Sequence, residues 1–468
     1  MTVAAPQGLT SVEIRATLGL QHADTEHEYR GVAADSRQVE PGQLFVALAG
    51  ERVHGANYLA EAATGGAVGA IVPAGRENFD LPLEYFAVAD PLTALATLAA
   101  AVRSRSRARV IAVTGSSGKT TVKEMIASAL AGARRVYRTE GNLNSQVGLP
   151  LTVLCAPADA DVWVVEVGAS EPGEIRKLAA IVAPDDVIVT TVGPAHLDAF
   201  GDESQVLEEK LDLVRAAPPD GAVVVGEVPE ALVRRAREIR ADTIVAGMGP
   251  EADVRPDRIE IEAERAGFER NGVWIEVAVG GEHHLRDALI ATAVAEVVGV
   301  PLDVVASGLA AYVPLGHRGS VVRIGGLTVL ADCYNANPES FRAAIAQCRD
   351  LYPGRRLAAF VGSMLELGEA EAAAHRDVAR ELISSGFDAV AATGAFADAF
   401  DALPASEKVA GVWTAYEPED AWPTFAESLR GDEVVLVKAS RGERLERVLV
   451  WLEDGFGTED EPTAEDRH

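Results

Sequence analysis

One stretch, Thr114-Gly-Ser-Ser-Gly-Lys-Thr-Thr121, constrains the fold of this chain more than any other feature. It follows the apolar run 110–114 and precedes a helical pattern that begins near Thr120. The glycines let backbone N–H groups converge on phosphate oxygens, while Lys119 and the Thr120 hydroxyl favour a magnesium nucleotide. Val113 replaces the first glycine of the common G-x-x-x-x-G-K-[ST] pattern. In a strand–loop–helix context, this stretch predicts nucleotide binding rather than a plain turn.

Alternating strand and helix patterns divide the chain into three α/β parts and a tail. Residues 1–105 indicate a small mixed domain, and 106–314 a central parallel-sheet domain that carries the phosphate loop. Residues 315–454 indicate a third, doubly wound domain, and we expect the acidic tail, 455–468, to be disordered. The main strands are expected at 110–114, 162–167, 186–192, 222–225, 327–332, 357–361, 389–393 and 433–438, with an antiparallel excursion at 259–263 and 273–279 and a helix at 287–298. The basic stretch 103–109 has the composition of a linker.

Composition excludes several classes of protein. The net charge of −29 opposes binding to nucleic acid or to an anionic membrane, and we attribute it to solubility or salt adaptation. No run of eighteen apolar residues predicts a membrane span, and the N-terminus lacks a signal-peptide pattern. Three cysteines without a C-x-x-C pair fit a reducing cytoplasm. Only six lysines occur among 42 positive charges, so each lysine within a motif is worth examining.

Polar residues follow several predicted strands, at the edge where α/β sheets bind ligands. Glu166 ends one apolar run, and His196 follows the next. A carboxylate there can bind magnesium beside Thr120, although a solvent-facing glutamate is an equal alternative and a lone histidine is more often structural. Lys210 lies in a segment that by itself has the pattern of a solvated helix face. Polar segments also follow three strands of the third part, at 332–338, 362–368 and 438–442, so two crevices facing each other are expected to hold a nucleotide and a second substrate.

Several short motifs follow one another along the chain from Asp35 to Arg447. They are Asp35-Ser-Arg37, Pro41-Gly-Gln-Leu-Phe-Val-Ala47, the stretch 114–125, Gly141-Asn-Leu-Asn144, Gly148-Leu-Pro150, Glu166, Pro172-Gly-Glu174, Ala195-His-Leu197, Phe200-Gly201, Tyr334-Asn-Ala-Asn-Pro338, Met364-Leu-Glu-Leu-Gly368, His375 and Lys438-Ala-Ser-Arg441. In this order they resemble the Mur ligase family of peptidoglycan synthesis, over nearly the whole chain. The Y-N-A-N-P and M-L-E-L-G pair resembles the member that adds D-alanyl-D-alanine to UDP-N-acetylmuramoyl-tripeptide. The Asp-Asn-Pro-Arg of the ligase that adds the preceding diamino acid does not occur.

The resemblance implies three domains, which bind the UDP-sugar peptide, ATP and the incoming dipeptide in that order. It implies catalytic roles for Lys119, His196 and Lys210. It assigns the nucleotide to Gly115, Ser116, Ser117, Gly118, Lys119, Thr120, Thr121, Arg318, Asp332 and Asn335. It assigns magnesium, as two ions, to Thr120, Glu166, His196 and Lys210, the lysine as a carbamate. It places the UDP-substrate near Ser36, Arg37, Asn142 and Asn144, and the dipeptide and acyl phosphate near Asn337, Lys438, Ser440 and Arg441.

The activity that follows from the resemblance is ATP-dependent amide-bond formation. The tripeptide carboxylate would become an acyl phosphate, the dipeptide amine would attack it, and ADP and phosphate would be released. Such an enzyme would act in the cytoplasm as a monomer and serve cell-wall biogenesis, cell shape and cell division. The chain departs from the family pattern at several positions, so the adenine contacts do not follow from the resemblance; the departures include Thr191, Gly226, Glu227, His284, Asp287 and Ser363.

Two alternatives stay open. One is a related Mur-type ligase with a different carboxylate and amine, although Asp35-Ser-Arg37 disfavours a folate substrate. The other is a P-loop ATPase that does not ligate, against which Lys210, His196 and the Lys438 motif argue. The identity of the third-position diamino acid is not encoded in any motif.

Overall fold

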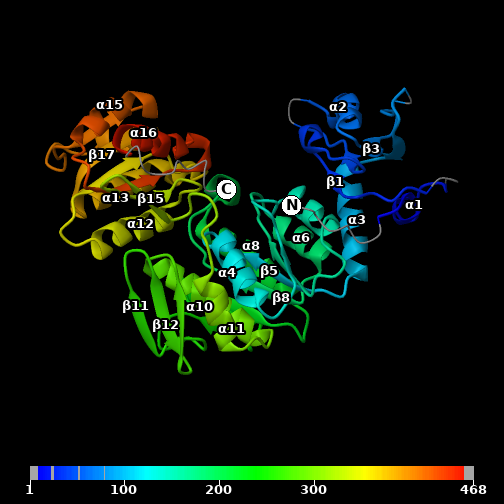
Figure 1. Ribbon diagram of the computed structural model, residues 1–468, viewed down its shortest axis with the longest axis horizontal. Coiled ribbons are helices and arrows are strands. Elements are labelled where there is room, and N and C mark those ends of the chain that lie inside the picture. Colours follow the sequence, from blue (N-terminus) through cyan, green and yellow to red (C-terminus); the bar gives the residue numbers. More distant parts are fainter. Residues whose placement is uncertain (1–8, 23–25, 51–52, 79, 458–468) are drawn as a thin grey trace.

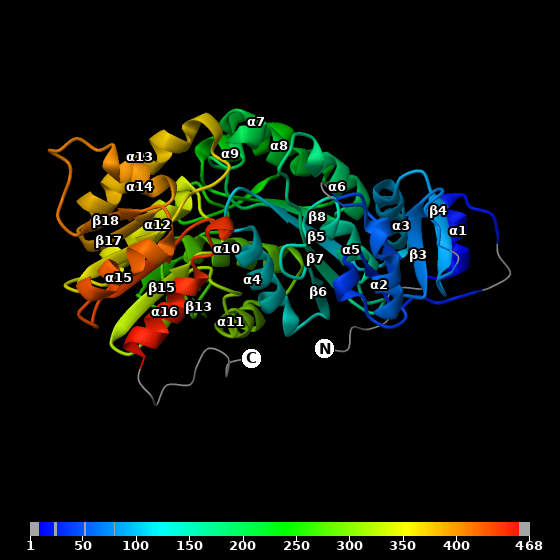
Figure 2. The same cartoon turned by 90° about the horizontal axis from the view of Figure 1, so that it is seen from above.

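The computed structural model describes residues 9–22, 26–50, 53–78 and 80–457, so the expected acidic tail lies largely outside the described residues. The chain forms three α/β domains, as predicted, arranged in sequence order. Figures 1 and 2 show the N-terminal and C-terminal sheets on opposite sides of the central sheet. None of the helices in the described ranges combines the length and apolar character needed to cross a bilayer.

The N-terminal sheet is parallel and runs in chain order. Its strands are β1 (Val32–Ala33), β2 (Leu44–Val46), β3 (Gly69–Pro73) and β4 (Glu84–Val88), with α1 (Ser11–Leu18), α2 (Leu59–Thr64) and α3 (Pro91–Arg105) packed around them. The Asp90 carboxylate caps α3 by accepting from two backbone N–H groups, and Pro91 occupies the first turn, where its missing N–H costs nothing. The prediction of a linker at 103–109 is wrong for most of these residues. The helix continues to Arg105 and the next strand begins at Arg109.

The central sheet holds six parallel strands in the order β10-β9-β8-β5-β7-β6. They are β5 (Arg109–Thr114), β6 (Val136–Arg138), β7 (Val162–Glu166), β8 (Asp186–Val189), β9 (Val223–Gly226) and β10 (Ile244–Ala246). Their apolar residues are buried because helices cover both faces: α4 (Lys119–Ala131), α5 (Gly148–Leu154), α6 (Glu174–Val182), α8 (Glu203–Ala216), α9 (Glu230–Ile239) and α10 (Glu282–Val297), with the short α7 (Leu197–Phe200) at one edge. The chain winds in opposite directions from β5, so the phosphate loop lies at the point where strand order reverses.

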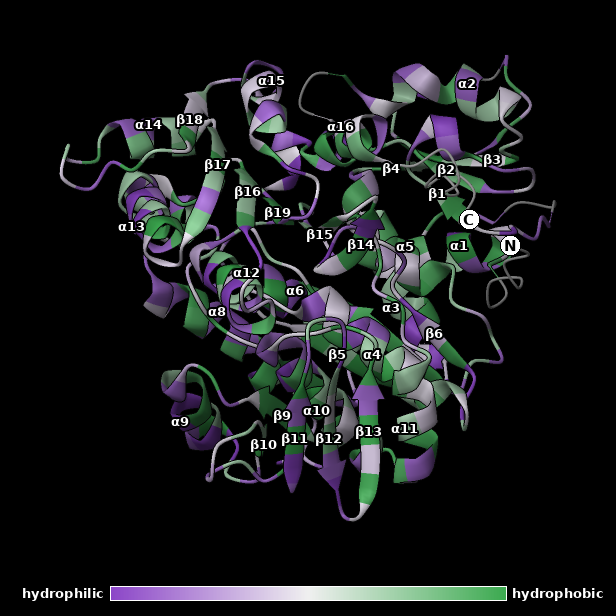
Figure 3. Cartoon of the chain, turned by 60° about the vertical axis from the view of Figure 1, so that its left-hand side comes forward, coloured by the Kyte–Doolittle hydropathy of each residue, from purple (hydrophilic) through white to green (hydrophobic). Residues whose placement is uncertain are grey.

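A three-stranded antiparallel sheet extends the central domain, as the alternating pattern predicted. It contains β11 (Arg258–Ile261), β12 (Ala266–Arg270), which the sequence analysis missed, and β13 (Val273–Val277). In Figure 3, β13 alternates between hydrophilic and hydrophobic residues, which fits one buried face packed toward α11 (Leu302–Ala310). Helix α10 begins at Glu282, five residues before the expected start, and therefore carries His283 and His284 in its first turn.

The C-terminal sheet has the order β14-β15-β19-β16-β17-β18. Five strands are parallel: β15 (Leu327–Asp332), β16 (Leu357–Val361), β17 (Phe387–Thr393), β18 (Val412–Ala415) and β19 (Val434–Lys438). The edge strand β14 (Ser320–Ile324) is antiparallel to β15 and was not predicted. Helices α12 (Pro338–Leu351), α13 (Glu371–Ser384), α14 (Ala395–Asp401), α15 (Pro418–Ser428) and α16 (Glu446–Phe456) cover the two faces. The last strand in sequence, β19, lies between β15 and β16, so its end is surrounded by loops from both neighbours.

Candidate functional site

The phosphate loop has the strand–loop–helix geometry that the sequence predicted. Gly115 and Gly118 have φ of +151° and +79°, a region that favours glycine. A Cβ on Gly115 would also lie 2.0 Å from Thr190 Oγ1, so a side chain cannot fit there. The Ser116 hydroxyl donates to Gly193 O (2.9 Å) and accepts from Gly193 N (3.1 Å), which ties the loop to the segment after β8.

Lys119 is the first residue of α4 and folds back over this loop. Its Nζ donates to Gly115 O at 2.8 Å and to Ser116 O at 3.2 Å. Burial lowers the pKa of Lys119, Glu166 opposes that shift, and the nearby Arg318 guanidinium adds to it. Two cations therefore lie close to the place where a phosphate would bind.

Glu166 is buried at the end of β7 and connects three elements. Its carboxylate accepts hydrogen bonds from Thr120 Oγ1 (2.9 Å) and Asn144 Nδ2 (2.7 Å). The solvent-facing alternative is wrong, because only 2% of Glu166 is exposed. Lys123, which the sequence analysis did not select, lies one helical turn beyond Lys119 with its Nζ 3.9 Å from Glu166 Oε2. The K-T-T-x-K spacing on α4, which places Lys119 and Lys123 one helical turn apart, is the signal that could have identified it.

His196 lies at the start of α7, facing the C-terminal domain. Its Nδ1 is 2.6 Å from Glu366 Oε2, and the backbone N–H of Leu197 donates to Glu366 O at 2.9 Å. Glu366 belongs to the M-L-E-L-G motif, which the sequence analysis used only as a family marker. The structure thus joins two distant motifs across the domain boundary. This contact leaves the Nε2 atom of His196 without a protein partner among the described residues.

Lys210 lies on the buried face of α8, and only 2% of it is exposed, so the pattern of a solvated helix face was misleading. Its Nζ lies 5.8 Å from the centroid of the Phe200 ring. Among the described residues, no carboxylate or carbonyl lies within hydrogen-bonding distance of Nζ. Burial and the neighbouring Lys119 ammonium lower the pKa of Lys210 to about 7.

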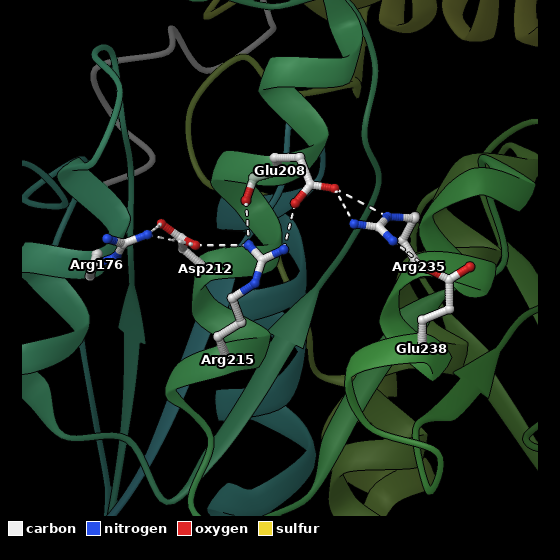
Figure 4. A network of polar contacts seen from close by, with 6 residues as sticks. All are labelled: Arg176, Glu208, Asp212, Arg215, Arg235 and Glu238. Atoms are coloured by element: carbon white, nitrogen blue, oxygen red, sulfur yellow. Dashed lines mark hydrogen bonds and ion pairs between the residues drawn. The ribbon is translucent and has the colours of Figure 1, made fainter.

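The outer face of α8 carries the charges that hold the helix in place (Figure 4). Arg215 pairs with Asp212 (2.8 Å) and Glu208 (2.5 Å), and Glu208 also pairs with Arg235 of α9 (2.8 Å). On the inner side, the Glu209 carboxylate accepts from Gly173 N (2.7 Å) and Ile175 N (2.8 Å) at the start of α6. Lys210 is therefore presented from a helix that is fixed on both sides, although none of the described residues forms an ion pair with it.

Lys438 ends β19 and is fully buried. The parallel register places Asp332 of β15 directly beside it, and the two side chains form an ion pair. Lys438 Nζ also donates to Asn335 O at 3.3 Å. Two residues on, the Ser440 hydroxyl accepts from Leu365 N at 3.0 Å, which joins the segment after β19 to the segment after β16. These strand-end segments lie together, as their positions in sequence predicted.

The C-terminal domain contacts the phosphate loop directly. Asn337 Nδ2 donates to Ser117 Oγ at 2.8 Å, while Asn337 Oδ1 caps α12 by accepting from Ser340 N at 2.8 Å. His375 holds the M-L-E-L-G segment, because its Nε2 accepts from Met364 N at 2.8 Å and its Nδ1 lies 2.7 Å from Glu371 O. These contacts bring the two crevices together, as expected.

One cavity of about 900 Å³ extends from the phosphate loop to Lys438 of the C-terminal sheet. Of the predicted site residues it is lined by Ser116, Ser117, Gly118, Lys119, Thr120, Thr121, Asn142, Asn144, Glu166, His196, Arg318, Asp332, Asn335, Asn337, Lys438 and Arg441. Gly115, Lys210 and Ser440 are not among the residues that line it. Ser36 and Arg37 lie instead in the N-terminal domain, where Ser36 Oγ donates to Glu61 (2.6 Å) and Arg37 pairs with Asp35 (2.7 Å).

The positions that depart from the family pattern also line this cavity, among them Thr191, Gly226, Glu227, His284 and Asp287. Glu227 accepts from Met248 N (3.0 Å) and Gly249 N (2.7 Å) and pairs with Arg286 (3.1 Å). Burial and the facing Glu339 carboxylate raise the pKa of Asp287 well above its usual range. Sequence reasoning did not select Glu339, which lies on α12 at the domain boundary.

Comparison with known proteins gives consistent matches along the chain. Residues 28–113 match the Mur ligase family catalytic domain, residues 113–295 the Mur ligase middle domain, and residues 317–441 the Mur ligase glutamate ligase domain. The UDP-N-acetylmuramoyl-tripeptide–D-alanyl-D-alanine ligase of Bacillus subtilis is 33% identical over 430 residues, covering 90% of this chain and 92% of that protein.

Solved structures show the same arrangement of domains. A crystal structure of MurF from Acinetobacter baumannii matches with a TM-score of 0.86 at 28% identity, over 96% of this chain and 100% of that one. The MurF ligase from Thermotoga maritima in complex with ADP matches with a TM-score of 0.79 at 29% identity, over 94% of this chain and 98% of that one.

Proposed function

Because the chain belongs to the Mur ligase family, we propose that it is an ATP-dependent ligase that joins D-alanyl-D-alanine to UDP-N-acetylmuramoyl-tripeptide. The observation that carries this proposal is the single cavity in which a phosphate loop faces Lys438 and Arg441 of the C-terminal sheet. A ligase of this kind must bring ATP, a carboxylate and an amine together, and the cavity offers cationic groups from two domains to do so. The product would be the pentapeptide precursor of peptidoglycan.

We assign residues 1–105 to the UDP-sugar peptide, 106–314 to ATP, and 315–454 to the dipeptide. In this assignment Ser36 and Arg37 contact the uridine end of the substrate. Asn142 and Asn144 contact its peptide end, where they line the cavity beside Glu166. Because Asn142 and Asn144 line the cavity and Ser36 and Arg37 do not, this assignment requires a long substrate that reaches from the N-terminal domain to the phosphate loop.

The residues present fit magnesium. Thr120 and Glu166 place a hydroxyl and a carboxylate oxygen 2.9 Å apart beside the phosphate loop, and hard oxygen ligands are those that magnesium prefers. The Glu366 carboxylate against His196 Nδ1 directs the other ring nitrogen, Nε2, toward a ligand role. We propose that Thr120 and Glu166 hold one ion, and that Glu166, His196 and a carbamate on Lys210 hold a second. Bound magnesium would offset the charge on the phosphate oxygens.

Lys210 is suited to take up carbon dioxide because, with a pKa of about 7, about half of its amine is unprotonated at pH 7. A neutral lysine nitrogen can attack carbon dioxide and lose a proton, which converts a cation into an anionic oxygen ligand. A charged lysine without a partner would be poorly placed in a buried position, so the modification also relieves a cost of burial.

The reaction would proceed in two steps. The tripeptide carboxylate attacks the γ-phosphorus of ATP while Lys119 and Arg318 stabilise the phosphate oxygens, giving an acyl phosphate and ADP. The neutral amine of the dipeptide, whose pKa is about 8 when free, then attacks the acyl carbon, and phosphate leaves. Asn337, Lys438, Ser440 and Arg441 would hold the dipeptide and the acyl phosphate. Exclusion of water by the contacts between the two domains protects the acyl phosphate from hydrolysis.

The proposal is tested by phosphate release from ATP with magnesium, the UDP-tripeptide and D-alanyl-D-alanine, each omitted in turn. Release that requires both substrates, with a product of the expected mass, supports it. Release without either substrate would indicate an ATPase that does not ligate. Binding of ATP without any release would indicate a ligase for another carboxylate and amine.

A further inference from the structure

Tyr334 lines the cavity and contacts two guanidinium groups. The guanidinium carbon of Arg318 is 3.5 Å from the centroid of the Tyr334 ring, and that of Arg441 is 5.0 Å from it. Arg441 Nη1 also donates a hydrogen bond of 3.0 Å to Tyr334 Oη. The ring therefore contacts Arg318 through its face, whereas Arg441 is held through the hydroxyl as well.

The backbone fixes this arrangement. Tyr334 follows β15, and Arg441 follows β19, the parallel strand beside it. Arg318 comes from the segment between α11 and β14, and Tyr334 N donates to His317 O at 3.3 Å. Gly319 N donates to Ala331 O at 3.0 Å on the other side of Arg318. Three separate segments thus place one aromatic ring and two cations together.

The two guanidinium groups have different neighbours. Arg318 lines the cavity together with Lys119 and lies near enough to lower the pKa of that lysine, so it belongs to the phosphate side of the cavity. Arg441 is exposed and follows Ser440, on the side of the C-terminal sheet. Two long cationic side chains held near each other repel and lose rotamer freedom, and the contacts that both make with the Tyr334 ring offset part of these costs.

We propose that Tyr334 is a positioning residue that directs Arg318 toward the nucleotide phosphates and Arg441 toward the carboxylate of the incoming dipeptide. The inference rests on the proposed function for the identity of these two ligands. It gives the tyrosine of the Y-N-A-N-P motif a physical role, because one ring supports the binding of both substrates. Tyr334 acts through the two arginines and need not touch either substrate.

Two substitutions distinguish the contribution of the Tyr334 ring from that of its hydroxyl. Tyr334→Leu removes both contacts. We therefore expect ATP affinity, measured by calorimetry, to fall by about 3- to 30-fold, and the KM for D-alanyl-D-alanine to rise by a similar factor. Tyr334→Phe keeps the ring face, so ATP affinity should stay within about twofold while the KM for the dipeptide rises by about 2- to 10-fold. Tyr416→Leu is the matched control, because Tyr416 follows β18 of the same sheet, is 71% exposed and does not line the cavity.

The coupling to Arg318 is tested by a double mutant. Tyr334→Leu added to Arg318→Ala should cause no further loss of ATP affinity, whereas losses that add would overturn the proposal. Equal behaviour of the Phe and Leu variants, or the same loss in Tyr416→Leu, would also overturn it. If Tyr334→Leu does not fold, Tyr334→Phe alone tests the proposal. A rise in the KM for the dipeptide with unchanged ATP affinity supports it, and an unchanged KM overturns it. A wild-type chain that binds ATP but does not ligate would refute the proposed function, and the ATP measurements would still test the role of the ring.

Discussion

Two buried lysines, one in the central domain and one in the C-terminal domain, have opposite surroundings. Lys438 lies beside Asp332 in the strand register and forms an ion pair with it. Lys210 has no carboxylate or carbonyl within hydrogen-bonding distance among the described residues, and its pKa falls to about 7. The same residue type therefore has a carboxylate partner in the C-terminal domain and, among the described residues, none at hydrogen-bonding distance in the central domain. Burial is the main cause of the lowered pKa of Lys210, and the neighbouring Lys119 ammonium adds to it.

The largest expected difference concerns stability. A pKa lowered from 10.5 to about 7 corresponds to roughly 5 kcal/mol against the charged form in the folded state. Since the folded state binds the proton less tightly, the penalty is complete below pH 7 and disappears above pH 10.5. Lys210→Met should therefore raise the free energy of unfolding by up to roughly 5 kcal/mol at pH 7, and by less at pH 9.5. Urea unfolding in buffer free of carbon dioxide measures this, and a loss of stability would show that Lys210 has a counter-charge.

Lys438→Met should have the opposite sign. Removing the ammonium leaves Asp332 without its partner, and breaking a buried pair costs about 3–5 kcal/mol. We expect the low end, about 3 kcal/mol, because 21% of the Asp332 side chain is exposed. The double variant with Asp332→Asn should recover part of the loss in the same urea experiment. Stabilisation by Lys438→Met alone would remove the contrast between the two lysines.

The two lysines should also differ in how their removal affects the ligase rate. Lys210→Ala should lose about 100-fold or more in ligase rate, a loss typical of removing one charge-stabilising group, and recover part of it when a short carboxylate such as acetate is added. Lys438→Ala should lose activity without such rescue, because a cation rather than an anion is missing. Full activity of Lys210→Ala without any supplement would contradict the carbamate. Mass spectrometry of the intact wild-type chain in bicarbonate tests independently whether the carbamate forms.

The smallest effect is expected at the contact between the two domains. Asn337→Asp keeps the acceptor that caps α12 but loses the donor to Ser117 and adds a negative charge beside the phosphate loop. Folding stability should change by less than about 1 kcal/mol, while the KM for ATP should rise by about tenfold. Ser340→Ala, which removes the hydroxyl half of the same cap but keeps the Asn337 contact with Ser117 and adds no charge, serves as the control. An unchanged KM for ATP in Asn337→Asp would mean that the contact does not act on the nucleotide.

Much of this arrangement follows from local sequence. The strands β15 and β16 occupy the predicted residues, because apolar runs bounded by polar turns determine buried parallel strands. The gathering of residues such as Glu166 and Lys438 at strand ends follows from the same pattern. The edge strands β6, β10, β14 and β18 were not predicted, since short or partly exposed strands carry a weak periodic signal.

Features that depend on tertiary contacts did not follow from the sequence. Lys210 lies in a charged segment, L-E-E-K-L-D, whose pattern indicates exposure, yet packing against α7 and α6 buries it. The contact of Glu366 with His196 joins residues 170 positions apart, and no local pattern encodes it. The role of Tyr334 depends on three segments that meet only in the folded chain.

Ligation through an acyl phosphate is tested most directly with a tripeptide substrate in which both oxygens of the terminal carboxylate are ¹⁸O. Attack of that carboxylate on the γ-phosphorus places one carboxylate oxygen in the bond to phosphorus, and the phosphate that leaves retains it. We expect the phosphate released during ligation to contain one ¹⁸O atom, as seen by mass spectrometry. Phosphate without ¹⁸O, released at the same rate as amide bonds form, would contradict the acyl phosphate and the order of steps proposed for this cavity.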